Sequence, residues 1–396
     1  MSRAGVFIQQ PSGYRAFTPA PLPPRPAVAM DADLVNLLSQ ADRVIGRLDM
    51  VTEVLPNPDL FIGMYVRQEA VLSSQIEGTQ STLEDVLQYE IDASGEPQIA
   101  DVQEVVNYVA AMNHGLARLP DLPLSLRLLK EIHEVLLRKG RGAHSTPGEF
   151  RRSQNWVGPP GSTLMNATFV PPPVAEMMTA LGDLEKFLHT NDLPVLIQAG
   201  LAHAQFETIH PFLDGNGRVG RLLITLLLCE KSVLKRPTLY LSHFFKLHRL
   251  EYYDRLTAIR QTGDWEGWLR FFLRGVIEVG TEAVETTRKI LALRDGHLAL
   301  LAEKMTGNSY AARGLDHLFA SPMTTVRRME SHLSASYKTA NKIIGEFENL
   351  GLLREIMGYK RNRVFAFEPY LALFPSRRVV QSEDQKIPVR NSGAEE

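Results

Sequence analysis

Residues 210–221, His-Pro-Phe-Leu-Asp-Gly-Asn-Gly-Arg-Val-Gly-Arg, combine residue types that bind phosphate with one that moves protons. Gly215 and Gly217 flank Asn216, and glycines let the backbone take tight or left-handed conformations that point several N–H groups at one place. A predicted helix starts directly afterwards and adds its own free N–H groups and the positive end of its dipole. The pattern therefore predicts a loop that cradles a polyphosphate.

Charged residues accompany this loop. Arg218 and Arg221 are three residues apart, so they share one helix face. Cations in a first helical turn oppose the macrodipole by about 0.3–1 kcal/mol each when exposed, so two of them favour a bound anion. Asp214 is placed to hold the Mg²⁺ that a nucleotide brings. His210 can accept the proton of an attacking Ser, Thr or Tyr hydroxyl, which typically contributes about 10²–10⁴ in rate.

Each of these residues also has a simpler interpretation. A His beside a Pro is usually structural, an Asp in this position can cap the helix, and Gly-Asn-Gly is often only a turn. Their order, directly before an Arg-x-x-Arg helix, favours the catalytic interpretation. Phe212 is predicted to anchor the loop by packing.

The stretch resembles the complete Fic-family motif, His-x-Phe-x-Asp/Glu-Gly-Asn-Gly-Arg-x-x-Arg, and the helices around it resemble the Fic fold over roughly residues 35–290. The resemblance implies transfer of AMP from ATP to a protein hydroxyl, with release of pyrophosphate. It also implies that His210 is the general base, that Asp214 binds Mg²⁺, and that Arg218 and Arg221 contact the β/γ end of ATP. The phosphate cradle would be Gly215, Asn216 and Gly217. The Doc branch of the family, which phosphorylates its targets, differs at those three positions, so nucleotidyl transfer is favoured.

One class of Fic proteins carries Ser/Thr-x-x-x-Glu-Gly/Asn on a helix before the core, and Ser73-Ser-Gln-Ile-Glu77-Gly78 resembles that pattern. A second match, Thr262–Gly267, lies at a Gly-Asp-Trp break that reads as a turn. Ala70, Ser73, Ser74 and Glu77 share one helix face, and their small side chains would let this helix approach the phosphate loop. We expect Glu77 to pair with Arg221 and so restrain the enzyme. The alternative is a surface carboxylate before a Gly C-cap.

Two further features resemble parts of the family's site. The Gly- and Pro-rich segment 141–173 stands where Fic proteins carry a β-hairpin flap, predicted from the pairing of residues 155–157 with 167–170. Its Thr168, Phe169 and Val170 could pair with the extended backbone of a target, or form an ordinary surface hairpin. Tyr252 and Tyr253 resemble a pair that lines the adenine pocket, although such pairs are more often core.

The periodicity of apolar residues predicts a mainly α fold, a Fic-type helical core with the flap, followed by a C-terminal winged-helix domain. Helices are expected between about 31 and 88 and over 102–119, 125–138, 174–189, 194–208, 217–230 and 249–290. The expected domains are an extended Pro-rich arm (1–30), a helical region with the inhibitory helix (31–120), the catalytic core (121–290), a linker helix with the winged helix (291–375), and a disordered tail (376–396).

The segment 315–367 reads as helix, turn, helix and two strands joined by a basic turn, with Ser336 as N-cap and Gly351 as C-terminal stop of the second helix. Residues 321–365 contain eight Lys and Arg against four Glu, a modest excess. A winged helix places its second helix in the major groove of DNA. The expected DNA contacts are Lys338, Lys342, Lys360, Arg361 and Arg363. Binding to protein, or to the rest of the chain, is the alternative.

The overall composition indicates which binding partners and which cellular location to expect. The 396 residues have a net charge of −2, so there is no global attraction to nucleic acid or anionic membrane. The N-terminus lacks a secretory signal, the longest apolar run is too short to span a bilayer, and one cysteine forms no internal disulfide, which favours a cytoplasmic protein.

The expected function is an autoinhibited protein adenylyltransferase that uses ATP and Mg²⁺ and modifies target proteins and itself. The alternatives are a DNA-binding regulator with a weakly catalytic, nucleotide-sensing domain, and a de-AMPylating enzyme. A homodimer is left open.

Overall fold

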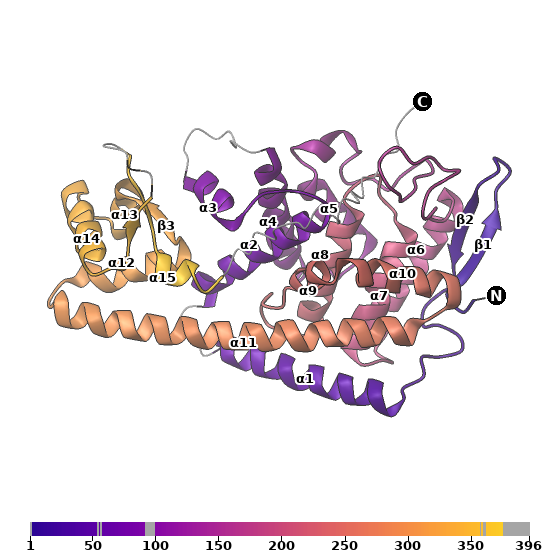
Figure 1. The fold of residues 1–396 in the computed structure, drawn as a ribbon, viewed down its shortest axis with the longest axis horizontal. Helices are drawn as coiled ribbons and strands as arrows, with labels where there is room; N and C mark the ends of the chain where they lie inside the picture. Colours follow the sequence, from indigo (N-terminus) through magenta and orange to yellow (C-terminus); the bar gives the residue numbers. More distant parts are fainter. Residues whose placement is uncertain are drawn as a thin grey trace.

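The computed structural model describes residues 2–53, 55, 58–91, 100–356, 358 and 362–374. Helices dominate these residues, and the strands form only two small sheets (Figure 1). The mainly α fold predicted from the sequence is therefore confirmed. The predicted tail, 376–396, lies outside the described residues, as do Lys360 and Arg361.

The helices before the motif follow the predicted periodicity closely. Those of the N-terminal region are α1 (Ala32–Glu53), α2 (Pro58–Ile76), α3 (Leu83–Ile91) and α4 (Ala100–Arg118). They are followed by α5 (Leu126–Leu136), the short 3₁₀ helix η1 (Arg141–His144) and α6 (Val174–Leu188). Ser125 caps α5, its side chain accepting a hydrogen bond from the Leu128 N–H.

Helices α7 (Val195–Ile209) and α8 (Asn216–Glu230) form the centre of the core. Every residue of α7 from Leu196 to Ile209 is buried, and so are most residues of α8. A helix that is surrounded on all sides has no solvent-facing side, which explains why α7 lacks a polar face. The motif joins these two helices, so buried helices hold it at both ends.

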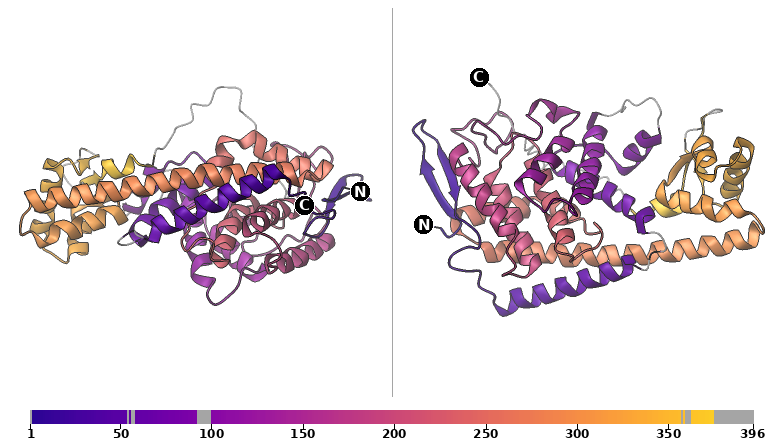
Figure 2. Two further views of the ribbon diagram at one scale, coloured as in Figure 1. Left: turned by 90° about the horizontal axis from the view of Figure 1, so that it is seen from below. Right: turned by 180° about the vertical axis from the view of Figure 1, so that it is seen from behind.

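The remaining helices of the core are α9 (Ser242–Leu247), α10 (Arg249–Thr262) and α11 (Trp265–Lys304). The single helix expected over 249–290 is divided at Gly263, which has a φ of 75°, and Asp264 caps the helix that follows. Helix α11 runs along most of the length of the molecule with α1 beside it (Figures 1 and 2). The predicted boundary at residue 290 thus falls inside one continuous helix.

The N-terminal segment differs from the extended arm that its composition predicts. Strands β1 (Gly5–Gln9) and β2 (Arg15–Pro19) form an antiparallel hairpin with Phe7 opposite Phe17. Ala16 and Phe17 are wholly buried. The prolines that suggested an arm lie mostly after β2, so composition averaged over 30 residues concealed a short apolar strand.

The C-terminal elements follow the order predicted for a winged helix. They are α12 (Ser309–Ala320), β3 (Met323–Thr325), α13 (Val326–Leu333), α14 (Tyr337–Asn349), β4 (Arg354–Glu355), β5 (Val364–Ala366) and α15 (Glu368–Leu371). The three strands form one antiparallel sheet in the order β3-β5-β4. Ser336 caps α14 as predicted, and Gly351, with a φ of 74°, follows its C-cap. Among the described residues, no helix combines the length and apolarity that crossing a membrane requires.

Candidate active site

The motif begins where α7 ends. His210 is the C-terminal cap of α7 and takes a left-handed conformation, with φ 49° and ψ 61°. Gly215 is also left-handed, with a φ of 79°, and is the N-cap of α8 without a side-chain hydrogen bond. Glycine suits Gly215 because it adopts this conformation without a steric penalty. The chain therefore reverses between two buried helices within six residues.

Asn216 braces this reversal. Its Oδ1 accepts from the Phe212 N–H and its Nδ2 donates to the Phe212 oxygen, both at 2.8 Å. Phe212 is wholly buried and stacks on His133 with ring centroids 3.7 Å apart, so its predicted anchoring role is confirmed. His133 accepts from the Gly148 N–H at Nδ1, which leaves Nε2–H to donate to the Asp214 oxygen at 3.0 Å. The Asn216 side chain therefore serves the loop, and only its backbone remains for a phosphate.

The first turn of α8 fits a polyphosphate. Among the described residues, the backbone N–H groups of Asn216, Gly217 and Arg218 make no hydrogen bond to a backbone oxygen. Free N–H groups of this kind at a helix start bind anions well. Arg218 is buried and donates from Nη1 to Glu104 at 3.0 Å, and its Nη2 lies 3.5 Å from Asp214 Oδ1.

The carboxylate of Asp214 fits the predicted Mg²⁺ contact only as a single ligand. Its Oδ1 accepts from the Gly215 N–H, and its side chain keeps 28% of its surface exposed. The described residues contain no cluster of three or more His, Cys, Asp or Glu side chains that could hold a metal. Mg²⁺ commonly binds through one or two carboxylates, with water and substrate phosphates supplying the other ligands. Asp214 meets that requirement.

The predicted contact between Glu77 and Arg221 is present. Arg221 Nη2 donates to Glu77 Oε1 at 2.7 Å, while its Nε donates to the Ser73 hydroxyl at 2.8 Å and Nη2 to the Ser73 oxygen at 3.1 Å. Gly217 lies directly beneath this pair, because a Cβ on it would be 2.3 Å from Glu77 Oε1. The carboxylate of Glu77 therefore lies against the first turn of α8, where an anion would bind. In the second match to the same pattern, Glu266 pairs with Arg3 instead.

Several buried carboxyl groups surround Arg221. Burial opposes the charge of its guanidinium, yet Glu77, Tyr252 and Glu207 raise its pKa above the ordinary value. Burial also raises the pKa of Glu207 to about 7 and that of Glu69 to about 7. The Arg221 guanidinium therefore stays charged over the whole physiological pH range and can always bind an anion.

The His210 imidazole is enclosed, with only 7% of the residue exposed. Among the described residues, neither Nδ1 nor Nε2 has a hydrogen-bond partner. Burial lowers the pKa of His210 to about 4, and the nearby Arg260 and Arg151 lower it further. An enclosed imidazole with two unused nitrogens requires an explanation, and a substrate hydroxyl would supply the missing partner.

The β-hairpin predicted for the flap segment is reduced to one β-bridge, and part of its edge already pairs with β2. Val157 and Phe169 exchange two backbone hydrogen bonds of 2.8 and 3.0 Å. Because backbone groups alternate along a strand, those of Thr168 and Val170 face the other side. There the Val170 oxygen accepts from the Phe17 N–H of β2 at 2.9 Å, while Thr168 is exposed. Phe169 itself is buried, with the Arg260 guanidinium 3.8 Å from its ring centre.

The two predicted adenine-pocket tyrosines differ in environment. Tyr252 is 1% exposed, and its hydroxyl lies 2.9 Å from Nε2 of His203, whose Nδ1 lies 2.8 Å from the Gly220 oxygen. Its ring stacks on Phe245, so the structure places Tyr252 in the core. Tyr253 is half-buried beside Arg249 and remains the member of the pair that solvent reaches. The two residues looked alike in sequence because core and pocket aromatics share helical spacing.

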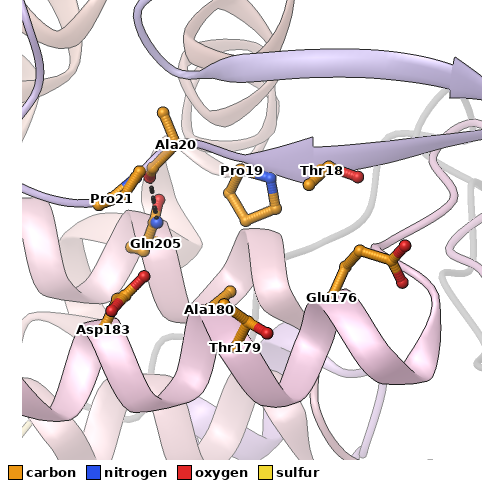
Figure 3. Close-up of a pocket in the computed structure, with 9 residues that line it drawn as sticks. All are labelled: Thr18, Pro19, Ala20, Pro21, Glu176, Thr179, Ala180, Asp183 and Gln205. Carbon is orange, nitrogen blue, oxygen red and sulfur yellow. Dashed lines mark hydrogen bonds between the residues drawn. The ribbon is translucent and has the colours of Figure 1, made fainter.

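A separate cavity of about 200 Å³ lies between β2 and α6 (Figure 3). Thr18 and Pro19 form one side, Glu176 and Asp183 the other, and Gln205 of α7 donates to the Ala20 oxygen at 2.8 Å. No residue that lines it belongs to the motif. The cavity shows how the hairpin rests on α6 and α7, away from His210.

The predicted DNA contacts that the structure describes lie on α14 and directly before β5. Lys338 is exposed, and Lys342 is exposed with its Nζ 3.6 Å from Glu346. Arg363 is held within the domain, since Nη2 donates to Asn341 at 3.3 Å and Nη1 lies 3.5 Å from Glu355. Only the two lysines of this group are therefore directed to solvent.

Four residues of the site had no signal in the sequence: Glu104, His133, Arg151 and Asn155. Glu104 lies 114 residues from Arg218, and nothing local marks it as a partner. Arg151 and Asn155 belong to the predicted flap, but their side chains donate to backbone oxygens of the motif. Such contacts depend on tertiary packing and leave no spacing pattern.

Comparison with known proteins gives two family matches. The Fic/DOC family N-terminal domain matches residues 35–117, and the Fic/DOC family domain matches residues 123–228. The chain is 32% identical over 182 residues to the protein adenylyltransferase Fic of Aedes aegypti, covering 44% of this chain and 32% of that one. It is 31% identical over 206 residues to the protein of the same name from Drosophila grimshawi, covering 50% and 38%. The chain thus spans about a third of the length of these curated relatives.

Among solved structures, a Fic family protein from Desulfovibrio desulfuricans G20 superposes with a TM-score of 0.56 at 21% identity, covering 86% of this chain and 97% of that one. This likeness concerns the fold. The two domain matches, which include α2 and the complete motif, assign residues 35–117 and 123–228 of this chain to the Fic/DOC family.

Proposed function

We propose that this protein is an Mg²⁺-dependent adenylyltransferase that moves AMP from ATP to a hydroxyl of target proteins and of itself. The observation that carries the proposal is the enclosed His210, with two unpartnered ring nitrogens, directly before the free N–H groups of α8. The relatives named protein adenylyltransferase support the same reaction.

In the proposed reaction, His210 takes the proton of the acceptor hydroxyl while the hydroxyl oxygen forms a bond to the α-phosphorus. The bond between the α-phosphorus and the bridging oxygen breaks, and pyrophosphate leaves. The N–H groups of Asn216, Gly217 and Arg218 stabilise the developing negative charge, and Arg221 holds the far end of the triphosphate. Bound at Asp214, Mg²⁺ would neutralise phosphate charge. The low pKa of His210 keeps the imidazole neutral, as a base must be.

Glu77 restrains this reaction in the proposal. It pairs with Arg221 and lies over Gly217. Its carboxylate therefore occupies the two places, the arginine and the start of α8, that the triphosphate would contact. Each tenfold of inhibition requires only about 1.4 kcal/mol, which one hydrogen-bonded Arg–carboxylate pair can supply. Release of Glu77 would free both groups at once.

The target is proposed to enter along the flap. Thr168 is exposed, and its backbone groups face the outer edge beside the segment that β2 occupies at Val170. Pairing through backbone groups tolerates varied sequences and would hold one hydroxyl near His210. This mode suits an enzyme that modifies both other proteins and itself.

The test is incubation with Mg²⁺ and ATP labelled at the α-phosphate, compared with ATP labelled at the γ-phosphate. Glu77→Gly should incorporate α-label into protein and the wild type much less. His210→Ala in the Glu77→Gly background should incorporate none. Incorporation of γ-label would indicate phosphoryl transfer and refute the proposal. GTP, CTP and UTP in parallel establish the base preference, which the phosphate cradle does not determine.

A further inference from the structure

Arg151 is a buried cation with an unusual set of partners. Only 1% of the residue is exposed. Within the described part of the chain no carboxylate pairs with it, and its guanidinium donates to backbone oxygens alone. These are the oxygens of His210 at 3.1 Å, Ser153 at 3.1 Å and Pro172 at 2.5 Å. Burial of a charge is costly, so a cation satisfied only by carbonyl groups needs a reason to be there.

The three oxygens belong to two parts of the site. Ser153 and Pro172 lie in the flap segment on either side of the Val157–Phe169 pairing. His210 carries the imidazole. The Arg151 N–H adds a further bond to the Pro211 oxygen at 2.9 Å. One side chain therefore joins the beginning of the flap, its end and the His210 loop.

The backbone of His210 needs such support. Its left-handed conformation is unfavourable for a residue with a Cβ and persists only where surrounding contacts fix it. The His210 oxygen accepts hydrogen bonds from two side chains, Arg151 and Asn155. Asn155 Nδ2 lies 3.2 Å from the His210 oxygen and also donates to the Phe212 oxygen at 2.9 Å. Both Arg151 and Asn155 come from the flap segment. The orientation of the imidazole is thereby tied to the position of the flap.

We propose that Arg151 is a positioning residue that holds the flap and the His210 loop in one frame, so that a hydroxyl docked on the flap meets the imidazole in reacting geometry. The proposal rests on the proposed adenylyl transfer. The planar guanidinium donates in several fixed directions at once, whereas a lysine ammonium is a single point and cannot span three carbonyl groups. Arg151 does not contact the start of α8, so nucleotide binding should not depend on it.

The experiment compares Arg151→Lys, Arg151→Met and Arg152→Met, all in the Glu77→Gly background. Arg152 is the adjacent arginine and is exposed, which makes it the matched control. The transfer rate is measured with α-labelled ATP, the affinity for Mg²⁺–ATP by calorimetry in the absence of transfer, and backbone hydrogen exchange over residues 153–172 and 210–213. Thermal unfolding verifies that each variant is folded.

We expect Arg151→Lys to reduce the transfer rate by about 10- to 100-fold while ATP affinity stays within about twofold of the control, because misplacement of reacting groups costs rate and not substrate binding. Hydrogen exchange should accelerate in both segments together. If Arg151→Met does not fold, Arg151→Lys decides, since it keeps the charge and most of the stem. A purely structural arginine would lower thermal stability and leave the rate of the folded variant unchanged.

Two results overturn the inference: Arg151→Lys transferring label as fast as Arg152→Met, or a loss that lies wholly in ATP affinity. Failure of the adenylyl-transfer proposal itself is distinguishable. In that case the Arg152→Met control would transfer no label either.

Discussion

Gly217 connects the two functions proposed for the motif, because its missing side chain leaves room for the carboxylate of Glu77 and, in the proposal, for a phosphate. A Cβ at this position would lie 2.3 Å from Glu77 Oε1 and 3.0 Å from Arg221 Nη1. The residue is helical and needs no positive φ, so its freedom from a side chain matters more than its backbone flexibility. At the residue scale, the proposed restraint therefore depends on how closely the Glu77 carboxylate can approach Gly217.

Gly217→Ala should lower the free energy of unfolding by about 1–3 kcal/mol, because overpacking against Glu77 outweighs the helix-propensity gain of alanine. In the Glu77→Gly background the same change should be close to neutral. Urea unfolding of the four proteins gives the coupling. Gly182→Ala on α6, where an added Cβ meets nothing within 4 Å, is the control. Equal effects with and without Glu77 would show that the carboxylate does not press on Gly217.

His210 should remain neutral well into the acid range. Its pKa of about 4 lies below the ordinary value near 6.5. The folded protein thus resists protonation of this group, whose contribution to stability is complete above about pH 6.5 and is lost as the pH falls through about 4. Arg260 and Arg151 favour the neutral imidazole, and the backbone of Glu207 and the carboxylate of Glu77 oppose them. NMR titration of the His210 ring in the nucleotide-free protein measures this. A midpoint near 6.5 would mean that the ring is solvated, contrary to this structure.

The sequence predicted the residues of the motif better than their partners. The Glu77–Arg221 contact was predictable because small residues on one helix face allow close approach and the spacing resembles a family pattern. The partner of Arg218 was not, since Glu104 is 114 residues away. For Tyr252 the sequence left the adenine pocket and the core as alternatives, and the structure places it in the core, where its hydroxyl pairs with His203. Asn216 was assigned to the phosphate cradle, but its side chain braces Phe212.

At the scale of elements, the flap and the N-terminal hairpin form one assembly. Strand β2 donates to the Val170 oxygen through Phe17, and the Phe17 ring contacts both Phe7 and Phe169, with centroids 4.9 and 6.3 Å apart. The helix positions were predictable from apolar periodicity, which α4 and α5 follow to within a few residues. The hairpin was not, because its five-residue strands stand next to a proline-rich stretch.

Phe17→Ala should reduce the free energy of unfolding by about 3–5 kcal/mol, the usual cost of emptying a buried phenylalanine site. Phe7, directly opposite in the hairpin, is 36% exposed and is the matched control, with a smaller expected loss. Urea unfolding compares the two variants. Hydrogen exchange should also rise at residues 168–170 in Phe17→Ala. Equal losses for both phenylalanines would mean that the hairpin does not pack on the flap as described.

At the scale of the whole molecule, the C-terminal region rests on α2, which carries Ser73 and ends directly before Glu77, and on α3. Phe319 contacts Phe61, Phe374 contacts Tyr65, and Arg328 donates to the Glu90 oxygen. Helix α11 connects the core and this region without a break. The order of the C-terminal helices and strands was predictable, helped by the turn signals at Ser336 and Gly351. Their docking on the rest of the chain was not, since it joins residues more than 200 positions apart.

If α14 binds DNA, Lys338 and Lys342 must carry much of the attraction, because Arg363 is engaged with Asn341 and Glu355. Replacement of both lysines by alanine should reduce the slope of log affinity against log salt by about 2 in magnitude, one phosphate contact for each. Fluorescence anisotropy with duplex DNA at several salt concentrations measures the slope. Lys289→Ala on α11 serves as the control. Absence of salt-sensitive binding in the wild type would leave the region as a protein-contacting domain.

The central claim is that an α8 cradle and His210 together transfer AMP, and that Glu77 holds them back. Intact-mass spectrometry after incubation with Mg²⁺–ATP tests it most directly. The account predicts an added mass of one or more AMP groups on Glu77→Gly, little on the wild type, and none on the Glu77→Gly/His210→Ala double variant. A phosphate increment, an AMP increment that persists without His210, or an unmodified Glu77→Gly protein would contradict it.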